Sequence, residues 1–128
     1  MFKLFTLQGA NRMLPDVDAR LTTLQQAVHD LEATQGLARA VRSGSAEALA
    51  LRQELAFLVR AVHDAKHELA ALGVMVPDVG RGVVEFPCRL GGEVVHLVWE
   101  RGQDAITHYH RLTGDDARRP VPGAPDAA

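Results

Sequence analysis

The chain has 128 residues, 47% of them hydrophobic and 5% aromatic, and its 14 Lys and Arg against 16 Asp and Glu give a net charge of −2. This length fits one domain, and the composition excludes wholesale disorder. The charge balance argues against nucleic acid or an anionic membrane as a partner, and no apolar run is long enough to span a bilayer. A single cysteine, Cys88, excludes an internal disulfide, so we expect a cytoplasmic protein.

The clearest pattern is an alternation of three- and four-residue spacings between apolar side chains. In the first stretch these positions are Leu14, Val17, Leu21, Leu24, Val28 and Leu31. In the second stretch they are Leu51, Leu55, Leu58, Val62, Ala65, Leu69 and Leu72. Such spacing keeps one stripe of a helix facing a partner helix, as in a coiled coil.

The boundaries of both helices are also marked in the sequence. Pro15 suits the first turn of the first helix, and Ser45 can cap the second. Gly73 follows the last apolar position and is typical of a helix stop. Because the link between the helices is short, we predict an antiparallel helical hairpin over residues 14–72.

The pattern changes after Gly73. Residues 74–82 contain proline and glycine and are interpreted as a connector, whereas residues 83–86, 93–101 and 104–112 have strand composition. Gly102-Gln103 suits a two-residue type II′ turn between the last two strands. That register places Val95, Leu97 and Trp99 on one face with Ile106, His108 and His110. It places His96, Val98, Glu100, Thr107 and Tyr109 on the other face.

The sequence thus predicts an α+β fold in which a coiled-coil-like helical hairpin precedes a small three-stranded antiparallel sheet over residues 82–112. Residues 1–120 form a single domain in this interpretation. The composition after Pro120 is that of a disordered tail, residues 121–128.

Four segments, FTLQGANRMLPDV, LGVMVPDVGRGVVEFPC, GEVVHLVWERGQDAITHYHRL and ARRP, occur in this order along the chain. In content and order they resemble the bacterial family called domain of unknown function 2203. Glu85 stands where that family has Asp before Phe-Pro, Val98 where it has Cys before Trp, and Tyr109 where it has the Trp of a Trp-His pair. The resemblance implies a prokaryotic cytoplasmic protein and carries no activity.

Two histidines in the last strand, His108 and His110, have a spacing that points both side chains the same way, as metal ligands require. Glu85, from a neighbouring strand, is a candidate third ligand for a divalent transition metal or a hydrogen-bond acceptor that orients one imidazole. Both histidines are expected beside Leu97 and Trp99 on the buried face. The alternative to metal binding is that they fill the interface between sheet and helices and form hydrogen bonds with backbone or carboxylate groups.

Other residues carry weaker chemical signals. His63 and His67 have the i, i+4 spacing of a helical metal chelate, but they lie on the outer side of the heptad, so a solvated helix face is the favoured interpretation. Arg118 and Arg119 can bind a phosphate or carboxylate, or form ion pairs with the body of the protein. Arg89 beside Cys88 can lower the pKa of the thiol, although a cysteine at a strand end is more often a small core residue.

Three functions follow, in decreasing order of support. The first is an assembly module that forms a homodimer or larger species by burying the apolar faces of helices and sheet. The second is a small metal-binding protein or metal-dependent enzyme that uses His108, His110 and Glu85. The third is a binder of anions through Arg118 and Arg119. No catalytic residue is predicted, so we expect a binding protein rather than an enzyme. The predicted interface residues are Leu51, Leu55, Leu58, Val62 and Leu69.

Overall fold

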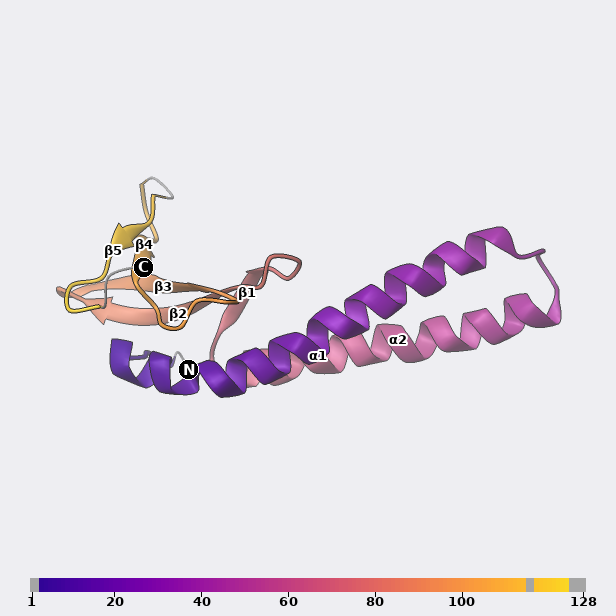
Figure 1. Ribbon diagram of the computed structural model, residues 1–128, viewed down its shortest axis with the longest axis horizontal. Coiled ribbons are helices and arrows are strands. Elements are labelled where there is room, and N and C mark those ends of the chain that lie inside the picture. The colour runs from indigo at the N-terminus through magenta and orange to yellow at the C-terminus, as the bar shows by residue number, and fades with distance from the viewer. Residues whose placement is uncertain (1–2, 115–116, 125–128) are drawn as a thin grey trace.

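A computed structural model describes residues 3–114 and 117–124 (Figure 1). The helices are α1 (Leu7–Ala40) and α2 (Ala46–Ala71). The strands are β1 (Met75–Asp78), β2 (Val83–Leu90), β3 (Glu93–Glu100), β4 (His108–Arg111) and β5 (Arg119–Pro120). Two helices followed by an antiparallel sheet confirm the predicted α+β fold. Within the described residues, neither helix has an apolar segment long enough to cross a bilayer.

The first helix starts earlier than predicted. Thr6 is its N-cap, and the Thr6 hydroxyl accepts a hydrogen bond from the amide of Gly9 at 3.0 Å. Pro15 therefore lies inside α1 rather than in its first turn. A proline inside a helix removes one backbone hydrogen bond. Ala10 and Val17, on either side of Pro15, are both fully buried, and this packing keeps the helix continuous.

The two helices pack against each other as an antiparallel hairpin (Figure 1). The residues of α2 that are buried or half-buried at the predicted spacing are Leu51, Leu55, Leu58, Val62, Ala65 and Leu69. Of these, Ala65 and Leu69 share a core with Leu21 and Leu24 of α1, and Val62 packs against it. The apolar stripe of α2 thus faces the other helix of the same chain, as the hairpin prediction requires.

Both ends of α2 are formed by the predicted residues. The Ser45 hydroxyl caps the helix by accepting a hydrogen bond from the amide of Ala48 at 3.0 Å. Gly73 has a φ of +92° and donates its amide hydrogen to the carbonyl of Ala70 at 2.9 Å. Glycine adopts this left-handed conformation without the steric cost that a side chain would add, so the helix ends here.

The sheet has five strands in the order β1-β2-β3-β4-β5, with each neighbouring pair antiparallel, so the prediction of three strands was incomplete. β1 forms within residues 74–82, which we had interpreted as a connector. Its Pro77 is tolerated because β1 is an edge strand, where a missing amide hydrogen disrupts little. β5 is the opposite edge and pairs with only two residues of β4.

The apolar face of the sheet packs against the base of the hairpin. Phe86 lies opposite Leu97, and Cys88 lies opposite Val95, and all four belong to the core that α1 completes. Phe5, just before α1, contacts Phe86 edge-to-face at 5.3 Å between ring centroids. Burial of a side chain such as Phe86 contributes about 1.5–3 kcal/mol.

Segments at both ends of the described chain join the sheet. The amide of Phe5 donates to the carbonyl of Pro87 at 2.7 Å, and Phe5 forms a parallel bridge with Cys88. Near the other end, the amide of Val121 donates to the carbonyl of Thr107 at 2.9 Å, and Val121 is buried. The packed part of the chain therefore continues past Pro120, where we expected a tail to begin. Residues 125–128 of that expected tail lie outside the described residues.

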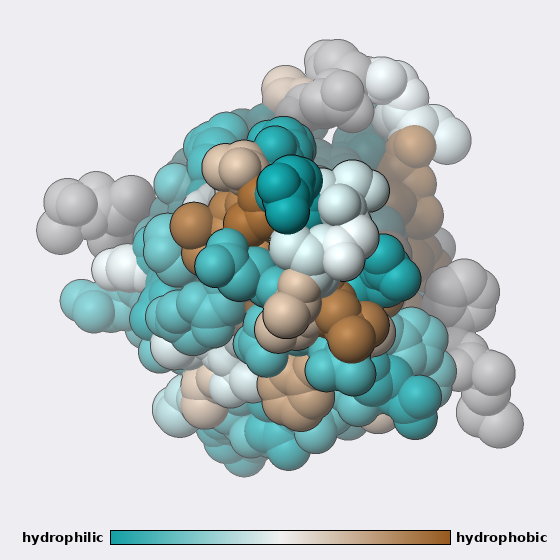
Figure 2. Space-filling model, turned by 90° about the vertical axis from the view of Figure 1, so that its right-hand side faces the viewer, coloured by the Kyte–Doolittle hydropathy of each residue, from teal (hydrophilic) through white to brown (hydrophobic). Residues whose placement is uncertain are grey.

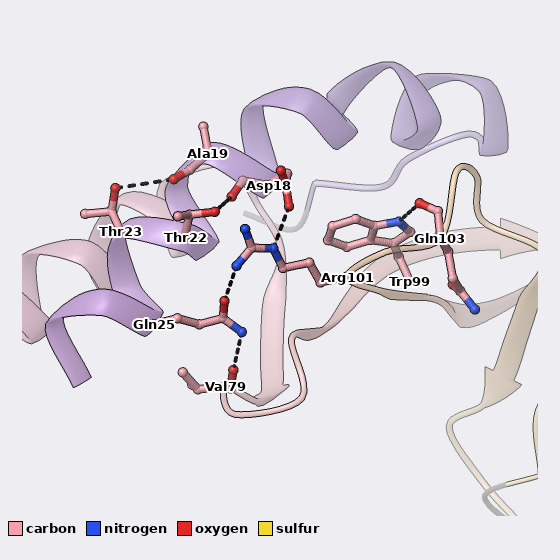
Figure 3. Close-up of polar contacts among 9 residues, drawn as sticks. All are labelled: Asp18, Ala19, Thr22, Thr23, Gln25, Val79, Trp99, Arg101 and Gln103. Atoms are coloured by element: carbon pink, nitrogen blue, oxygen red, sulfur yellow. Dashed lines mark hydrogen bonds and ion pairs between the residues drawn. The ribbon is translucent and has the colours of Figure 1, made fainter. Parts of the chain in front are cut away.

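A polar junction ties α1 to the sheet (Figure 3). Arg101, after β3, forms an ion pair with Asp18 at 3.1 Å and a hydrogen bond with the side-chain oxygen of Gln25. Gln25 in turn donates to the carbonyl of Val79 at 2.9 Å. Gly82 is required at this junction, because a Cβ there would lie 2.8 Å from the Cβ of Arg101. These contacts fix where the hairpin meets the sheet.

Candidate metal centre

The face of the sheet opposite the core carries polar side chains from three adjacent strands. Side chains alternate along a strand, so Pro87 of β2 lies on the face opposite to Phe86. His96 of β3 is directly opposite Pro87, and His110 of β4 is directly opposite His96. This row therefore places two imidazoles side by side.

The adjacent row on the same face runs from Glu85 of β2 through Val98 of β3 to His108 of β4. Glu85 is thus a diagonal neighbour of His96, a relation in which long side chains of adjacent strands can meet. Val98 is buried, and it separates Glu85 from His108 within the row. The carboxylate consequently turns toward the neighbouring row of histidines.

Glu85, His96 and His110 converge on one point. His96 Nδ1 lies 3.0 Å from Glu85 Oε1, and His110 Nε2 lies 2.7 Å from Glu85 Oε2. The two imidazole rings are 5.5 Å apart between centroids and nearly perpendicular. One potential ligand atom from each of the three residues lies within 4.8 Å of the other two. A metal ion could therefore contact all three after small side-chain movements.

The backbone orients one of these imidazoles. His110 Nδ1 lies 3.0 Å from the carbonyl oxygen of Arg111, an acceptor that holds the ring in this orientation. Nε2 then faces the carboxylate of Glu85. Histidines that bind metals commonly donate their second N–H to a backbone carbonyl, because this fixes the tautomer that leaves the other nitrogen free to bind.

The cluster is shielded but still reachable from solvent. The side chains of Glu85, His96 and His110 expose 16%, 17% and 19% of their surface, respectively. Partial burial strengthens the attraction between a carboxylate and a cation relative to bulk water. The remaining exposure leaves a path for an ion or a small molecule.

A family model described as an uncharacterized conserved protein, DUF2203, matches residues 3–121. The chain belongs to the DUF2203 family. No curated protein and no solved structure matches it significantly. The match covers both helices and all five strands of this DUF2203 protein, so the cluster lies within the family domain.

Of the residues predicted to bind metal, Glu85 and His110 meet in the DUF2203 protein and His108 does not join them. His108 Nδ1 instead lies 2.7 Å from the hydroxyl oxygen of Thr107. The third member of the cluster is His96, which the predicted register places on the opposite face from His110. The predicted placement of His108 and His110 beside Leu97 and Trp99 was therefore wrong.

The error comes from the turn after β3. The amide of Gln103 donates to the carbonyl of Glu100 at 3.0 Å, so Arg101 and Gly102 are the central turn residues. Gly102 has a φ of +106° and is the second central residue, as in a type II turn, instead of the first. β3 ends at Glu100 and β4 begins at His108, so the connection spans residues 101–107 instead of two residues, and Val95 pairs with Arg111 rather than with His110. A register shift of one residue moves every side chain of β4 to the other face.

A signal for the correct register was present in β4. Tyr109 lies between two histidines, and it is the residue of this strand best suited to an apolar face. In the structure Tyr109 pairs with Leu97 and packs against the core. Placing Tyr109 with Leu97 would have brought His96 and His110 onto one face.

The predicted helical histidine pair lies on the exposed side of α2. His63 and His67 stack with 5.6 Å between ring centroids. In the described part of the chain, no third His, Cys, Asp or Glu joins them within metal-binding distance. The arrangement is that of a solvated helix face.

The predicted arginine pair lies at the start of β5, the edge strand beside β4. Arg118 and Arg119 are exposed, and Arg119 pairs with Tyr109 on the core side of β4. Arg119 therefore starts from the face opposite to Glu85, and the binding of an anion by Arg118 and Arg119 stays a prediction.

Cys88 is a core residue. Burial raises the pKa of the Cys88 thiol, so it favours the uncharged form. The cation of Arg89 does not reverse this effect, because Arg89 is on the opposite, solvent-exposed side of β2. Cys88 therefore lacks the low pKa of a reactive cysteine.

Proposed function

We propose that this protein binds one divalent transition-metal ion through Glu85, His96 and His110. The observation that carries the proposal is the convergence of three potential ligand atoms within 4.8 Å of one another. Metal–ligand bonds of about 2.0–2.2 Å place the ligand atoms around one ion roughly 3–4 Å apart. The side chains need to move only slightly to reach that geometry, because the strands already align them.

The donor set favours particular metals. Two imidazoles and one carboxylate suit zinc, iron, cobalt or nickel, whereas magnesium and calcium prefer oxygen ligands alone. Three protein ligands also leave at least one coordination position open. Structural zinc sites are usually closed by four protein ligands, so this arrangement is of the type that keeps a position for water or another ligand.

Titration of untagged, chelator-treated protein with Zn²⁺ or Co²⁺ tests the proposal. Calorimetry should give one ion per chain. The variants His96→Ala, His110→Ala and Glu85→Ala should each lose more than about 100-fold in affinity, because changes in residues that merely orient metal ligands already cost 10–100-fold. The matched control is His108→Ala, on the same face and outside the cluster, which should bind like the unaltered protein.

The outcome that contradicts the proposal is equally specific. Unchanged affinity in His96→Ala and His110→Ala, with intact circular dichroism, would mean that any bound metal lies elsewhere. Loss of binding in His108→Ala alone would restore the ligand set predicted from the sequence.

We propose self-association through exposed apolar side chains of the hairpin as a second function. Four large apolar side chains in this region are exposed: Leu37 (61%), Leu49 (53%), Phe57 (67%) and Val59 (56%). The hairpin extends well beyond the sheet, so no described strand covers them (Figure 1). Figure 2 views the molecule from the end of the hairpin and shows brown, hydrophobic residues among the teal, hydrophilic ones. Leu49 and Phe57 are eight residues apart and therefore share one side of α2, and exposed apolar groups gathered on one side of a helix often mark an interface between proteins.

A second copy of the chain is the partner that this proposal names, and light scattering coupled to size exclusion tests it. The unaltered protein should elute as a dimer or larger species. Phe57→Ser should shift it toward the monomer, because Phe57 is the most exposed of these apolar residues. The control Met75→Ser removes an exposed apolar residue near the sheet and should not change the mass. A monomer for the unaltered protein at high concentration would refute self-association.

A further inference from the structure

We infer that the metal centre takes a small oxyanion, a phosphate or carboxylate group, held between the metal ion and Arg89. This inference rests on the proposed binding of a metal by Glu85, His96 and His110. It adds the chemical class of the ligand that fills the open coordination position.

The register places Arg89 beside the centre. Arg89 is two residues beyond Pro87 on β2, so its side chain starts from the same face as Glu85. Pro87 is directly opposite His96, which makes Arg89 and Glu85 the two diagonal neighbours of His96 on this strand. Diagonal neighbours lie about 7–8 Å apart, within reach of a long side chain. Glu85 already covers that span, since its carboxylate lies 3.0 Å from His96.

The guanidinium of Arg89 is available for a ligand. Arg89 is exposed, and no acidic residue within 3–114 or 117–124 forms an ion pair with it. Other arginines near the sheet are neutralised: Arg81 by Glu100 at 2.7 Å, and Arg111 by Glu93 at 2.7 Å. Arg89 therefore keeps its charge and its hydrogen-bond donors on the side of the sheet that carries the cluster.

The charges of the occupied centre favour an anion. A divalent ion, one carboxylate and two neutral imidazoles leave one positive charge, and Arg89 adds another. An oxyanion can place one oxygen on the metal and present others to the planar donor fork of arginine. A neutral or cationic ligand would leave both positive charges without a counterpart.

Cobalt-loaded protein in a non-coordinating buffer provides the test. Inorganic phosphate and acetate are added in separate titrations, and the visible absorption bands of Co²⁺ report a change in its ligands. At least one of the two anions should shift the bands in a saturable manner. Saturation by phosphate alone or by acetate alone would identify which oxyanion the site prefers.

The role of Arg89 is tested by Arg89→Gln and Arg89→Lys. Arg89→Gln should weaken binding of the anion about 10- to 100-fold, the expected loss of a hydrogen bond to a charged group, while affinity for Co²⁺ changes little. Arg89→Lys keeps the positive charge but lacks the planar donor fork, so its affinity for the anion should lie between those of Arg89→Gln and the unaltered protein. Arg52→Gln, an exposed arginine on α2, is the matched control and should leave both affinities unchanged.

The results separate this inference from the proposed function. Failure of the unaltered protein to bind Co²⁺ would refute the metal site and the inference with it. Binding of Co²⁺ with no spectral response to either anion would refute the inference and leave the metal site standing. An anion response of equal strength in Arg89→Gln would refute the role of Arg89.

Discussion

The two faces of the sheet are built from alternating residues of the same strands, yet different forces hold their side chains in place. On the core face, Phe86 and Leu97 are fully buried against the hairpin. On the other face, Glu85, His96 and His110 are held by directional contacts of 2.7–3.0 Å. The stability of the core face depends on the apolar area that it removes from water. The arrangement of the polar face depends on which residues the strand register places next to one another.

The largest effect is expected on the core face. Phe86→Ala should lower the free energy of unfolding by about 3–5 kcal/mol, because it removes a fully buried ring and leaves a cavity beside Phe5. Urea denaturation measures this change. The half-exposed Met75 is the control, and Met75→Ala should change the free energy by less than about 0.5 kcal/mol. A similar small change in Phe86→Ala would contradict the assignment of the core.

An intermediate effect is expected on the polar face. Glu85→Gln in the metal-free protein should cost about 1–3 kcal/mol, because it weakens two hydrogen bonds between a carboxylate and imidazoles. Glu100→Gln on the same face removes the ion pair with the exposed Arg81 and should cost about 0–1 kcal/mol. Equal stabilities of the two variants would show that the cluster contributes no more than a surface ion pair.

A smaller effect, limited to alkaline pH, is expected at Cys88. In the unfolded chain the thiol has the ordinary pKa of cysteine, about 8.5. In the folded protein, burial raises the pKa of Cys88 above that value. Between these two values the folded state binds more protons, so the free energy of unfolding should fall as the pH rises. Below both values the contribution is constant. Urea denaturation of Cys88→Ala across this range should lack that slope; an identical slope in both proteins would exclude Cys88 as its source.

The smallest effect is expected where β3 begins and β4 ends, at an exposed end of these two strands. Arg111 donates hydrogen bonds to both carboxylate oxygens of Glu93 and thereby lowers the pKa of Glu93. The resulting stabilisation should be present above about pH 4.3, the ordinary value for glutamate, and should disappear as the pH falls through the lower folded pKa. Denaturation midpoints of Glu93→Gln and the unaltered protein should therefore converge in acid and in high salt. A difference that persists in acid would point to another cause.

The hairpin was predictable because its determinants are local. The spacing of Leu51, Leu55 and Leu58 fixes which side of α2 is apolar, and Ser45 and Gly73 mark its ends through contacts with residues at most three positions away. The one local misjudgement was Pro15, where long-range burial of neighbouring residues outweighs the lost hydrogen bond.

The sheet was less predictable because its register depends on turn geometry. The strand character of β2, β3 and β4 was visible in the composition, and so were Glu85 and His110 as candidate ligands. The connection between β3 and β4 spans residues 101–107 rather than the two-residue loop that Gly102-Gln103 suggests, and the resulting one-residue shift in pairing decides which face receives His110. The edge strands β1 and β5 are too short, and too rich in residues that disfavour strands, to be recognised from composition.

The pairing of Phe5 with β2 also has a consequence for how the chain folds. During synthesis Phe5 emerges long before Pro87, so the contact between them cannot form until both helices and β1 have been made. Closing so long a loop from a disordered chain is entropically costly and slow. The hairpin reduces that cost, because it forms from local contacts and returns the chain close to its starting point. The folded helices thus bring β2 close to the N-terminal segment that contains Phe5.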